Sequence, residues 1–588
     1  MRGENLAGAR LAGVPGVTVD AVRVNGNGHY AFADVTIDPA AVPGPRRLTL
    51  TTKAGRASVP FELLPPLPAA GRFAGVDSGD LVYLVMPDRF ADGDPRNDDP
   101  AKARGLLDRG KARYYHGGDL RGVIDRLPYI KSLGATALWL NPWYDNADRL
   151  NERERYDGAA ITDYHGYGAV DFYAVDEHLG DLATLRELVD KAHALGLKVV
   201  QDQVANHTGP YHPWAADPPS PSWFHGTADK HLACTWQIWT LGDPHSTEAM
   251  RRATLDGWFL DILPDLNQSD PEVARYVIQN ALWWVDATGL DAIRQDTLPY
   301  VSRAFWRDWM AAQKRDHPAV TMVGEMSDGD PRLVSFFEGG QARFDGIDSG
   351  VDTLFDFPLY YAIRATFAQG GKIRPLAQMI ARDTLYQRPE LLWTFLGSHD
   401  MPRFMSEAGA TLDGLRLAFT FLLTARGTPL VYAGDEIAMP GGADPDNRRD
   451  FPGGFPGDAV NAFDAAARSA DQQRVWERVA RLGTLRRELA PLRRGRTVHL
   501  LVDDQAYAYA RVAGDEAVIV VLNNDTKPVD VKVPIEGTPL TRTAPPPSWS
   551  VRAAPSASGV PSIGTFTSTG FVSLFSTTIT ASSPATRA

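Results

Sequence analysis

Apolar and polar positions follow two kinds of pattern along the chain. Over residues 1–70, short alternating runs are separated by Gly, Asn and Pro, which is typical of a small β-sandwich of the immunoglobulin type. These runs are Thr18–Val24, Tyr30–Ile37, Arg47–Thr52 and Ala57–Leu63. The same pattern predicts a C-terminal β-sandwich over residues 491–588. Its runs are Thr497–Val502, Ala506–Arg511, Ala517–Asn523 and Val529–Val533, with Phe571–Phe575 as a candidate last strand.

Between these regions, apolar strand-like runs alternate with amphipathic helical patterns. The strand-like runs are Leu81–Met86, Ala137–Leu140, Lys198–Gln201, Leu290–Arg294, Val320–Val323, Leu391–Leu396 and Leu430–Tyr432. Helical patterns cover Asp119–Leu133, Leu182–Leu195, Pro271–Ala287 and Asp413–Ala425. This alternation predicts an α/β fold with a parallel sheet, and the number of units favours a closed (β/α)8 TIM barrel over residues 71–202 and 266–490. Thr353–Phe357 is the candidate for the strand that is hardest to place.

One connection is too long for a plain loop. After the third strand, which ends near Asp202, the next strong helix begins near Pro271, so residues 203–265 are expected to form an inserted domain B. The insert contains Trp214, Trp223, Trp236, Trp239 and Trp258. Tryptophan faces can stack on sugar rings, but they can equally form the insert's own small core. Both interpretations stay open at this stage.

Charge and composition exclude some function classes. The formal net charge of -12 argues against a nucleic-acid partner, whose binding depends on cationic side chains. No run of about twenty apolar residues predicts a membrane span. The N-terminus lacks the apolar core of a signal peptide, which as written indicates a cytoplasmic protein, or a periplasmic or secreted one if the N-terminus is trimmed. Cys234 is the only cysteine, which excludes an intrachain disulfide.

Acidic residues at the ends of predicted barrel strands are the strongest candidates for chemistry, because catalytic residues of such barrels gather there. Asp296, two residues after Arg294, follows one strand, Glu325 ends the next, and His399-Asp400 ends a later one. Glycosidic cleavage needs one carboxylate at the anomeric carbon and another to protonate the leaving oxygen. Structural salt bridges are the alternative interpretation of these acids on spacing alone.

Four segments, in the same order, resemble the signature regions of the α-amylase superfamily of glycoside hydrolases. They are Asp202-Gln-Val-Ala-Asn-His207, Gly289–Asp296, Val323-Gly-Glu325 and Ser398-His-Asp400. The resemblance implies that Asp296 is the nucleophile, that Glu325 is the acid/base and that Asp400 helps to distort the bound sugar. It further implies substrate-binding roles for a larger set of residues. This set comprises His165, Tyr167, Asp202, His207, Arg294 and His399.

Other segments resemble the cyclomaltodextrinase and neopullulanase-like branch of that superfamily. They are Leu263-Pro-Asp-Leu-Asn267, Asp446–Gly454 and Gly28–Val35, and the glutamine at position 295 is a further feature of that branch. The resemblance implies hydrolysis of α-1,4 bonds in cyclodextrins and short maltodextrins, with an α-glucan oligosaccharide as the partner. A starch-active α-amylase, a pullulan-active neopullulanase and a glucan transglycosylase remain alternatives. A non-catalytic glucan-binding protein is the alternative of another class, although such a protein is expected to lose catalytic acids. The oligomeric state stays open.

A structural calcium site is expected in the loop after the first barrel strand. Asp92, Asp94, Asn97 and Asp98 supply hard oxygen donors around a glycine turn, and calcium takes six to eight oxygen ligands. The resemblance to the branch implies that the segment Gly117-Gly118-Asp119 completes this site, with Gly117 and Asp119 as ligands. A solvated acidic turn is the alternative.

Overall fold

A closed sheet of parallel strands is the centre of the computed structural model, which describes residues 1–539, 548–553, 562–567 and 570–573. Its strands, in spatial order, are β17 (Thr353–Leu354), β16 (Thr321–Gly324), β15 (Ala292–Gln295), β12 (Lys198–Gln203), β7 (Ala137–Leu140), β6 (Val82–Val85), β19 (Thr428–Tyr432) and β18 (Trp393–Phe395). A parallel bridge between Phe355 and Trp393 joins the two outer strands of this order and closes the sheet. The predicted (β/α)8 barrel is therefore confirmed. Its strand that was hardest to place from the sequence is β17, Thr353–Leu354, which lies within the candidate segment Thr353–Phe357.

Large side chains fill the inside of the barrel. The rings of Trp139, Phe355 and Trp393 lie 5.5 to 6.3 Å apart between centroids, and each of the three residues is at most 4% exposed. Helices cover the outside, so the strands are buried on both faces, which explains their nearly continuous apolar sequences. The interior is a packed core, and the open space for a ligand must therefore lie at its ends.

Helices begin at the positions where polar caps stand in the sequence. The helices of the barrel region are α1 (Leu120–Ser132), α2 (Leu182–Ala194), α5 (Pro271–Thr288), α6 (Arg303–Asp316), α7 (Pro331–Phe336), α8 (Phe357–Phe367), α9 (Arg374–Ile380), α10 (Leu412–Thr424), α11 (Ala470–Glu488) and α12 (Ala490–Arg494). Asp119 and Asp181 accept hydrogen bonds from the first-turn amides of α1 and α2. Gly289 ends α5 in the left-handed conformation and leads directly into β15.

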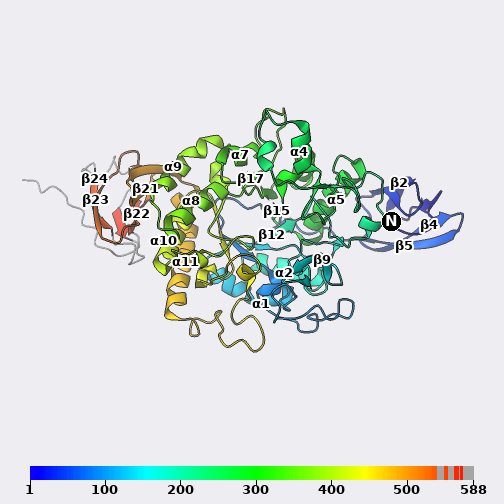
Figure 1. The fold of residues 1–588 in the computed structure, drawn as a ribbon, viewed down its shortest axis with the longest axis horizontal. Helices are drawn as coiled ribbons and strands as arrows, with labels where there is room; N and C mark the ends of the chain where they lie inside the picture. Colours follow the sequence, from blue (N-terminus) through cyan, green and yellow to red (C-terminus); the bar gives the residue numbers. More distant parts are fainter. Residues whose placement is uncertain (540–547, 554–561, 568–569, 574–588) are drawn as a thin grey trace, which may run out of the picture.

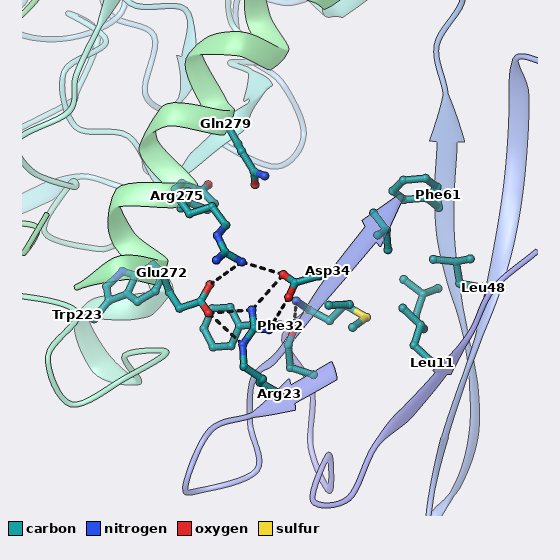
Figure 2. A pocket seen from close by; sticks show the side chains of 16 residues that line it. Leu11, Arg23, Phe32, Asp34, Leu48, Phe61, Trp223, Glu272, Arg275 and Gln279 are labelled. Carbon is teal, nitrogen blue, oxygen red and sulfur yellow. Dashed lines mark hydrogen bonds and ion pairs between the residues drawn. The ribbon is translucent and has the colours of Figure 1, made fainter. Parts of the chain in front are cut away.

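The N-terminal strands form two small sheets at one end of the molecule, on the right in Figure 1. One contains β1 (Arg10–Ala12), β4 (Gly44–Thr52) and β5 (Gly55–Leu63), and the other contains β2 (Val17–Val24) and β3 (Ala31–Ile37). Figure 2 shows how these strands meet α5 of the barrel. Arg23 bridges Asp34 and Glu272 at 2.5 and 2.9 Å, and Arg275 of α5 approaches Asp34 at 2.8 Å.

The insert between β12 and α5 contains short elements: α3 (Pro213–Ala216), β13 (Leu232–Ala233), α4 (Glu248–Leu255) and β14 (Gly257–Trp258). Its tryptophans divide into two groups. Trp223 and Trp258 are each buried, and Trp214 packs edge-on against Trp223, so these three side chains serve packing. Trp236 and Trp239 are 49% and 48% exposed. The expectation of a structural core therefore describes part of the set only.

A second pair of small sheets lies between β7 and α2. It consists of β8 (Tyr144–Asp145) with β11 (Asp171–Val175), and β9 (Asn151–Tyr156) with β10 (Ala159–Ile161). At the left end of Figure 1, the C-terminal strands β20 (Arg496–Val502), β21 (Ala506–Ala513), β22 (Glu516–Asn523), β25 (Ser562–Thr567) and β26 (Gly570–Ser573) share one sheet, and β23 (Val529–Pro534) pairs with β24 (Ser548–Ala553). The last two positions of the expected strand Phe571–Phe575 lie outside the described residues. In the part of the chain that is described, no helix is long and apolar enough to cross a bilayer.

Arg486 ties the outer helices to the barrel. Its buried guanidinium, on α11, donates to the carbonyl oxygens of Leu423, Ala425, Gly427 and Ser78 at 2.5 to 3.4 Å. Leu423 lies in the last turn of α10, Ala425 and Gly427 lie between α10 and β19, and Ser78 precedes β6. One side chain therefore satisfies the end of a helix and the approaches to two barrel strands.

We expect Arg486→Ala to lower the free energy of unfolding by about 2–4 kcal/mol, because four buried carbonyl groups would lose their donor. The measurement is urea denaturation followed by tryptophan fluorescence. Arg487→Ala, at the exposed neighbouring position, is the matched control and should change stability by less than about 0.5 kcal/mol. Equal effects of the two variants would contradict this role of Arg486.

Candidate active site

Three carboxyl groups surround the guanidinium of Arg294 at the ends of adjacent barrel strands. In the parallel register, Arg294 of β15 pairs with Asp202 of β12 on one side, and Gln295 pairs with Gly324 of β16 on the other. Asp296 and Glu325 therefore follow their strands at the same level. Arg294 Nη1 lies 2.7 Å from Asp202 Oδ1 and 2.8 Å from Asp296 Oδ1, and its Nη2 lies 2.9 Å from Glu325 Oε2.

Tyr167 connects this cluster to the end of β18. Its hydroxyl donates to Asp202 Oδ2 at 2.8 Å and lies 2.7 Å from His399 Nε2. The rings of Tyr167 and His399 are nearly parallel, 5.5 Å apart. His165 accepts a hydrogen bond from the backbone N–H of Tyr167 through Nδ1, at 3.1 Å, which fixes the loop that carries both residues.

Asp400 lies next to His399, with its side chain 38% exposed to solvent. Its Oδ2 is 3.2 Å from His399 Nε2, and its Oδ1 is 3.2 Å from Arg448 Nη2. Arg448 also donates to the backbone oxygen of His399 at 2.9 Å. Arg448 was not among the predicted site residues, although it lies in the segment Asp446–Gly454 that resembles the family. That segment was the signal that could have found it.

The surroundings of the carboxyl groups give them different pKa values. Burial raises the pKa of Glu325 to about 8, against the opposing charge of Arg294 and with the help of Asp296. Burial also raises the pKa of Asp202 to about 7. Burial would raise the pKa of Asp400 too, but its interactions with His399, Arg448 and Arg294 outweigh burial and hold that pKa below its ordinary value. At neutral pH the site therefore offers a protonated Glu325 beside an ionised Asp400.

The three histidines of the site are neutral, and two of them have a ring nitrogen free for further hydrogen bonds. Burial lowers the pKa of His399 to about 3, and burial lowers the pKa values of His165 and His207 as well. His207 Nε2 and His399 Nδ1 are buried and, among the described residues, have no hydrogen-bond partner. Buried polar atoms normally find partners, so these nitrogens are suited to ligand groups such as hydroxyls.

The structure brings the nine predicted catalytic and substrate-binding residues to the same end of the barrel. Contacts join eight of them directly: His165, Tyr167, Asp202, Arg294, Asp296, Glu325, His399 and Asp400. His207 lies near them, because the charge of Asp296 acts on its pKa, and it is held by backbone pairing with Asp265 and a ring contact with Phe259 at 5.5 Å. A carboxylic acid, carboxylates, a fixed cation and neutral histidines in one place can perform general acid catalysis on a neutral, hydroxyl-rich ligand.

The predicted calcium loop presents unpaired oxygen atoms. The Oδ1 atoms of Asp92, Asn97 and Asp98 are buried and lack hydrogen-bond partners within the described residues. Burial and the neighbouring carboxylates raise the pKa of Asp98 to about 7. Gly117 has a φ of +91°, and a Cβ there would lie 3.0 Å from the Asp98 carboxyl group, so this backbone passes close to the acid. These hard oxygen donors fit a calcium ion.

Two of the predicted calcium ligands, Asp94 and Asp119, already make other contacts. Asp94 pairs with Arg96 at 2.7 Å, and its carboxylate is thus already compensated. Asp119 caps α1, accepting from Gly122, and also accepts from the backbone N–H groups of Gly93 and Asp94. A separate acidic cluster, Asp145, Asp148 and Glu177, has suitable spacing for a cation, but Lys102 Nζ lies 2.9 to 3.3 Å from all three carboxylates. The lysine compensates that cluster.

Comparison with known proteins gives consistent relatives. Residues 84–480 match the family model of the α-amylase catalytic domain. Neopullulanase 2 of Thermoactinomyces vulgaris is 32% identical over 78% of this chain and 72% of its own length. A cyclomaltodextrinase of Geobacillus thermopakistaniensis is 29% identical over 77% and 70%, respectively. A β/α-amylase of Paenibacillus polymyxa is 32% identical over 75% of this chain, but the match spans only 33% of that longer protein.

Among solved structures, an Anoxybacillus α-amylase has a TM-score of 0.68 and 31% sequence identity, covering 83% of this chain and 98% of its own. The matched family region contains the barrel strands and the carboxyl groups at their ends.

The stability of the protein should depend on Arg294 in a pH-dependent way. The folded pKa values of Glu325 and Asp202 lie above their values in the unfolded chain, about 4.3 and 3.9, so these groups add stability at low pH that is lost as the pH rises through about 7 to 8. Arg294→Gln removes the compensating cation and raises those pKa values further. We expect a loss of about 3–5 kcal/mol near pH 7. This loss should grow as the pH rises from about 7 to 9, because the wild-type groups have then released their protons while those of the variant, with higher pKa values, still lose stability.

Urea denaturation at several pH values measures this loss. Arg303→Gln is the control, because Arg303 is also buried but pairs with the single carboxylate of Asp345. Its destabilisation should change little over the same range. A pH-independent loss for Arg294→Gln would contradict the electrostatic interpretation of the cluster.

Proposed function

Because the chain belongs to the α-amylase family, we propose that it is a retaining glycoside hydrolase that cleaves α-1,4-glucosidic bonds of cyclodextrins and maltodextrins. The observation that carries the proposal is the pair of carboxyl groups, Asp296 and Glu325, held side by side on the guanidinium of Arg294. A retaining mechanism needs two such groups about 5–5.5 Å apart, whereas an inverting one needs about 6.5–9.5 Å to admit a water molecule. Contact with one guanidinium favours the short spacing.

In the first step, Asp296 attacks the anomeric carbon and Glu325 gives its proton to the leaving oxygen. In the second step, Glu325 removes a proton from water, which hydrolyses the glycosyl–enzyme bond and releases Asp296. The raised pKa of Glu325, about 8, supports its role as the acid, because the group arrives protonated at neutral pH. The Arg294 guanidinium at 2.8 Å stabilises the carboxylate that Asp296 needs for attack.

The remaining residues suit the binding of one glucosyl ring. Tyr167, stacked on His399, provides a flat surface beside the acids, and the free nitrogens of His207 and His399 can bond sugar hydroxyls. Asp400, ionised and partly open to solvent, is placed to bind two hydroxyls of the ring and to favour its distortion. His165 and Asp202 orient Tyr167 and Arg294 through the contacts described above.

The relatives support the proposed substrate preference. Proteins named cyclomaltodextrinase and neopullulanase are about 30% identical to this chain, which favours cyclic and short glucans as its substrates. The higher identity to neopullulanase 2 keeps pullulan, along with starch, as the second candidate substrate. The covalent intermediate can be intercepted by water or by a sugar hydroxyl, so a transglycosylase is the corresponding alternative in reaction type.

We expect Asp296→Asn to reduce initial rates on β-cyclodextrin by about 10⁴-fold or more, because it removes the attacking group. The wild-type protein should open β-cyclodextrin faster than it cleaves soluble starch or pullulan. The first product, followed by proton NMR, should carry the α-anomer. Asp345→Asn makes the same chemical change away from the site and is the matched control.

An inverted first product would overturn the retaining mechanism. Preference for starch or pullulan would overturn the cyclodextrin assignment while leaving the mechanism intact. Full activity of Asp296→Asn would show that the nucleophile lies elsewhere.

We further propose a division into four domains. The N-terminal domain comprises residues 1–70, the catalytic barrel residues 71–202 and 266–490, domain B residues 203–265, and the C-terminal domain residues 491–588.

A calcium ion is proposed at the loop between β6 and α1, bound by the free oxygens of Asp92, Asn97 and Asp98 together with nearby backbone oxygens. The ion would neutralise these acids and hold the loop against Gly117. Asp119 would support the loop through its backbone contacts.

Calcium chelation should lower the melting temperature, and added calcium should restore it, because a bound ion stabilises the folded state. Asp98→Asn should abolish this response by removing a charge from the ligand set. Asp148→Asn, in the cluster that Lys102 compensates, should keep the full response. A response lost in Asp148→Asn but kept in Asp98→Asn would assign the ion to the other cluster.

A further inference from the structure

Two arginine side chains are buried at the junction between the barrel and the C-terminal sheet, on the left of Figure 1. Arg486 belongs to α11 and Arg511 to β21, and each residue is 1% exposed. Strand β21 packs against α12, and the hydroxyl of its Tyr509 contacts that of Thr424 at the end of α10. The two guanidiniums therefore reach the same buried junction from different parts of the fold.

Neither guanidinium has all its N–H groups hydrogen-bonded. Arg511 Nη2 donates to the carbonyl oxygen of Gly495 at 2.6 Å, but its Nε and Nη1 atoms have no partner among the described residues. Arg486 uses both Nη atoms on backbone carbonyls, and its Nε is left without a partner there. Buried N–H groups normally find acceptors, so these atoms suit an acceptor from outside the chain.

A third guanidinium, that of Arg493 on α12, lies at the edge of the same junction. A Cβ at Gly79 would lie 4.0 Å from Arg493 Cδ, and the residue before this glycine accepts a hydrogen bond from Arg486. Gly495, two residues after Arg493, accepts from Arg511. Arg493 is half-buried, and its Nε lacks a hydrogen-bond partner in the described part of the chain. Three cationic side chains thus border one junction.

None of these three guanidiniums has a carboxylate partner. They form no ion pair with the residues that the structure describes, and the sequence contains no aspartate or glutamate after Glu536. Burial, together with the charge of Arg511, lowers the pKa of Arg486 to about 9, and burial lowers the pKa of Arg511 to about 10. Both side chains therefore stay positively charged at neutral pH.

Two carboxylates act on the pKa values of the buried pair, but each already has its own cation. The carboxylate of Asp80 lies 2.7 Å from Lys198 Nζ. The carboxylate of Asp383 lies 2.6 Å from Arg426 Nη2, which is itself a neighbouring positive charge. Buried like charges without a counter-ion are costly, whereas a bound anion supplies both the missing charge and the missing acceptor.

We propose that this junction binds a small monovalent inorganic anion such as chloride, held by Arg486, Arg493 and Arg511. Chloride accepts several N–H donors without a preferred direction, and a monovalent ion loses less hydration free energy on burial than a divalent oxyanion does. The anion joins α11 and α12 to β21, and so ties the C-terminal sheet to the barrel. Arg486 contacts Ser78, which precedes β6, so the site lies at the opposite end of the barrel strands from the catalytic carboxyl groups.

Thermal unfolding in sodium chloride and in sodium gluconate at equal ionic strength separates site binding from general salt effects, because gluconate is too large for a buried site. We expect chloride to raise the melting temperature by about 1–3 °C, saturating by about 100 mM, since an anion that binds only the folded state stabilises it. Arg511→Gln and Arg493→Gln should lose this response. Arg494→Gln, at a neighbouring side chain that is 70% exposed, is the matched control and should keep it.

Crystals grown in sodium bromide locate the ion, because bromide scatters anomalously. An anomalous peak between Arg486 and Arg511 supports the proposal. Equal melting temperatures in chloride and gluconate, or a bromide peak at Arg294 alone, would overturn it. A chloride response that persists in Arg493→Gln would do the same, and this half-buried position keeps the test decisive even where Arg511→Gln fails to fold.

Discussion

The guanidinium of Arg294 places a permanent positive charge among three carboxyl groups that barrel closure brings together. Without it, Asp202, Asp296 and Glu325 would be like charges in a poorly solvated space, a situation that proteins avoid by neutralisation or pairing. The parallel register gives them no freedom to separate, because Asp202 and Arg294 are directly paired across strands. The neutral state of the surrounding histidines follows from the same constraint, since the space is buried and its charge is already balanced around one cation.

One cation cannot compensate three carboxylates fully. Acids that look alike in the sequence therefore acquire different pKa values. Glu325 and Asp202 respond by holding protons more tightly, with pKa values of about 8 and 7. Asp400 is more exposed and has a second cation, Arg448, at 3.2 Å, so it stays ionised. Position therefore assigns an acid and a carboxylate without any difference in their chemistry, which is how glycosidases obtain two roles from similar side chains.

The sequence predicted most of the barrel because its strands are continuous apolar runs and its helices carry polar caps. Even the two-residue strand β17 lies within the candidate segment Thr353–Phe357, which was the hardest strand to place. Strand β1 was missed, because Arg10–Ala12 is too short to show alternation and pairs only with β4, far along the chain. Strand ends alone pointed to Arg294, Asp296 and Glu325, whereas Asp202 entered the predicted site through the family resemblance. Arg448 could not, because a loop position gives no register from which to infer a contact.

Tertiary packing determines which tryptophans of the insert are buried, and sequence periodicity could not predict this. Five tryptophans in the insert are equivalent in sequence, yet Trp223 and Trp258 are buried while Trp236 and Trp239 are half exposed. Which of them face solvent depends on where α4 and the segment around Phe259 lie, and neither is encoded by a repeating pattern. The same holds for the calcium loop, where spacing predicted four equivalent donors but Asp94 pairs with Arg96.

Half of the residues with unusual backbone conformations lie in the insert or at the end of β15. Eight non-glycine residues with positive φ occur among the described residues, and four of them, Trp236, Leu260, Asp261 and Thr297, lie in the insert or directly after Asp296. Thr297 illustrates the reason: its left-handed backbone turns the N–H toward Glu325 Oε2, at 2.9 Å. Local strain at this position supplies a hydrogen bond to the acid. The barrel core, where packing is regular, provides the stability that permits such conformations.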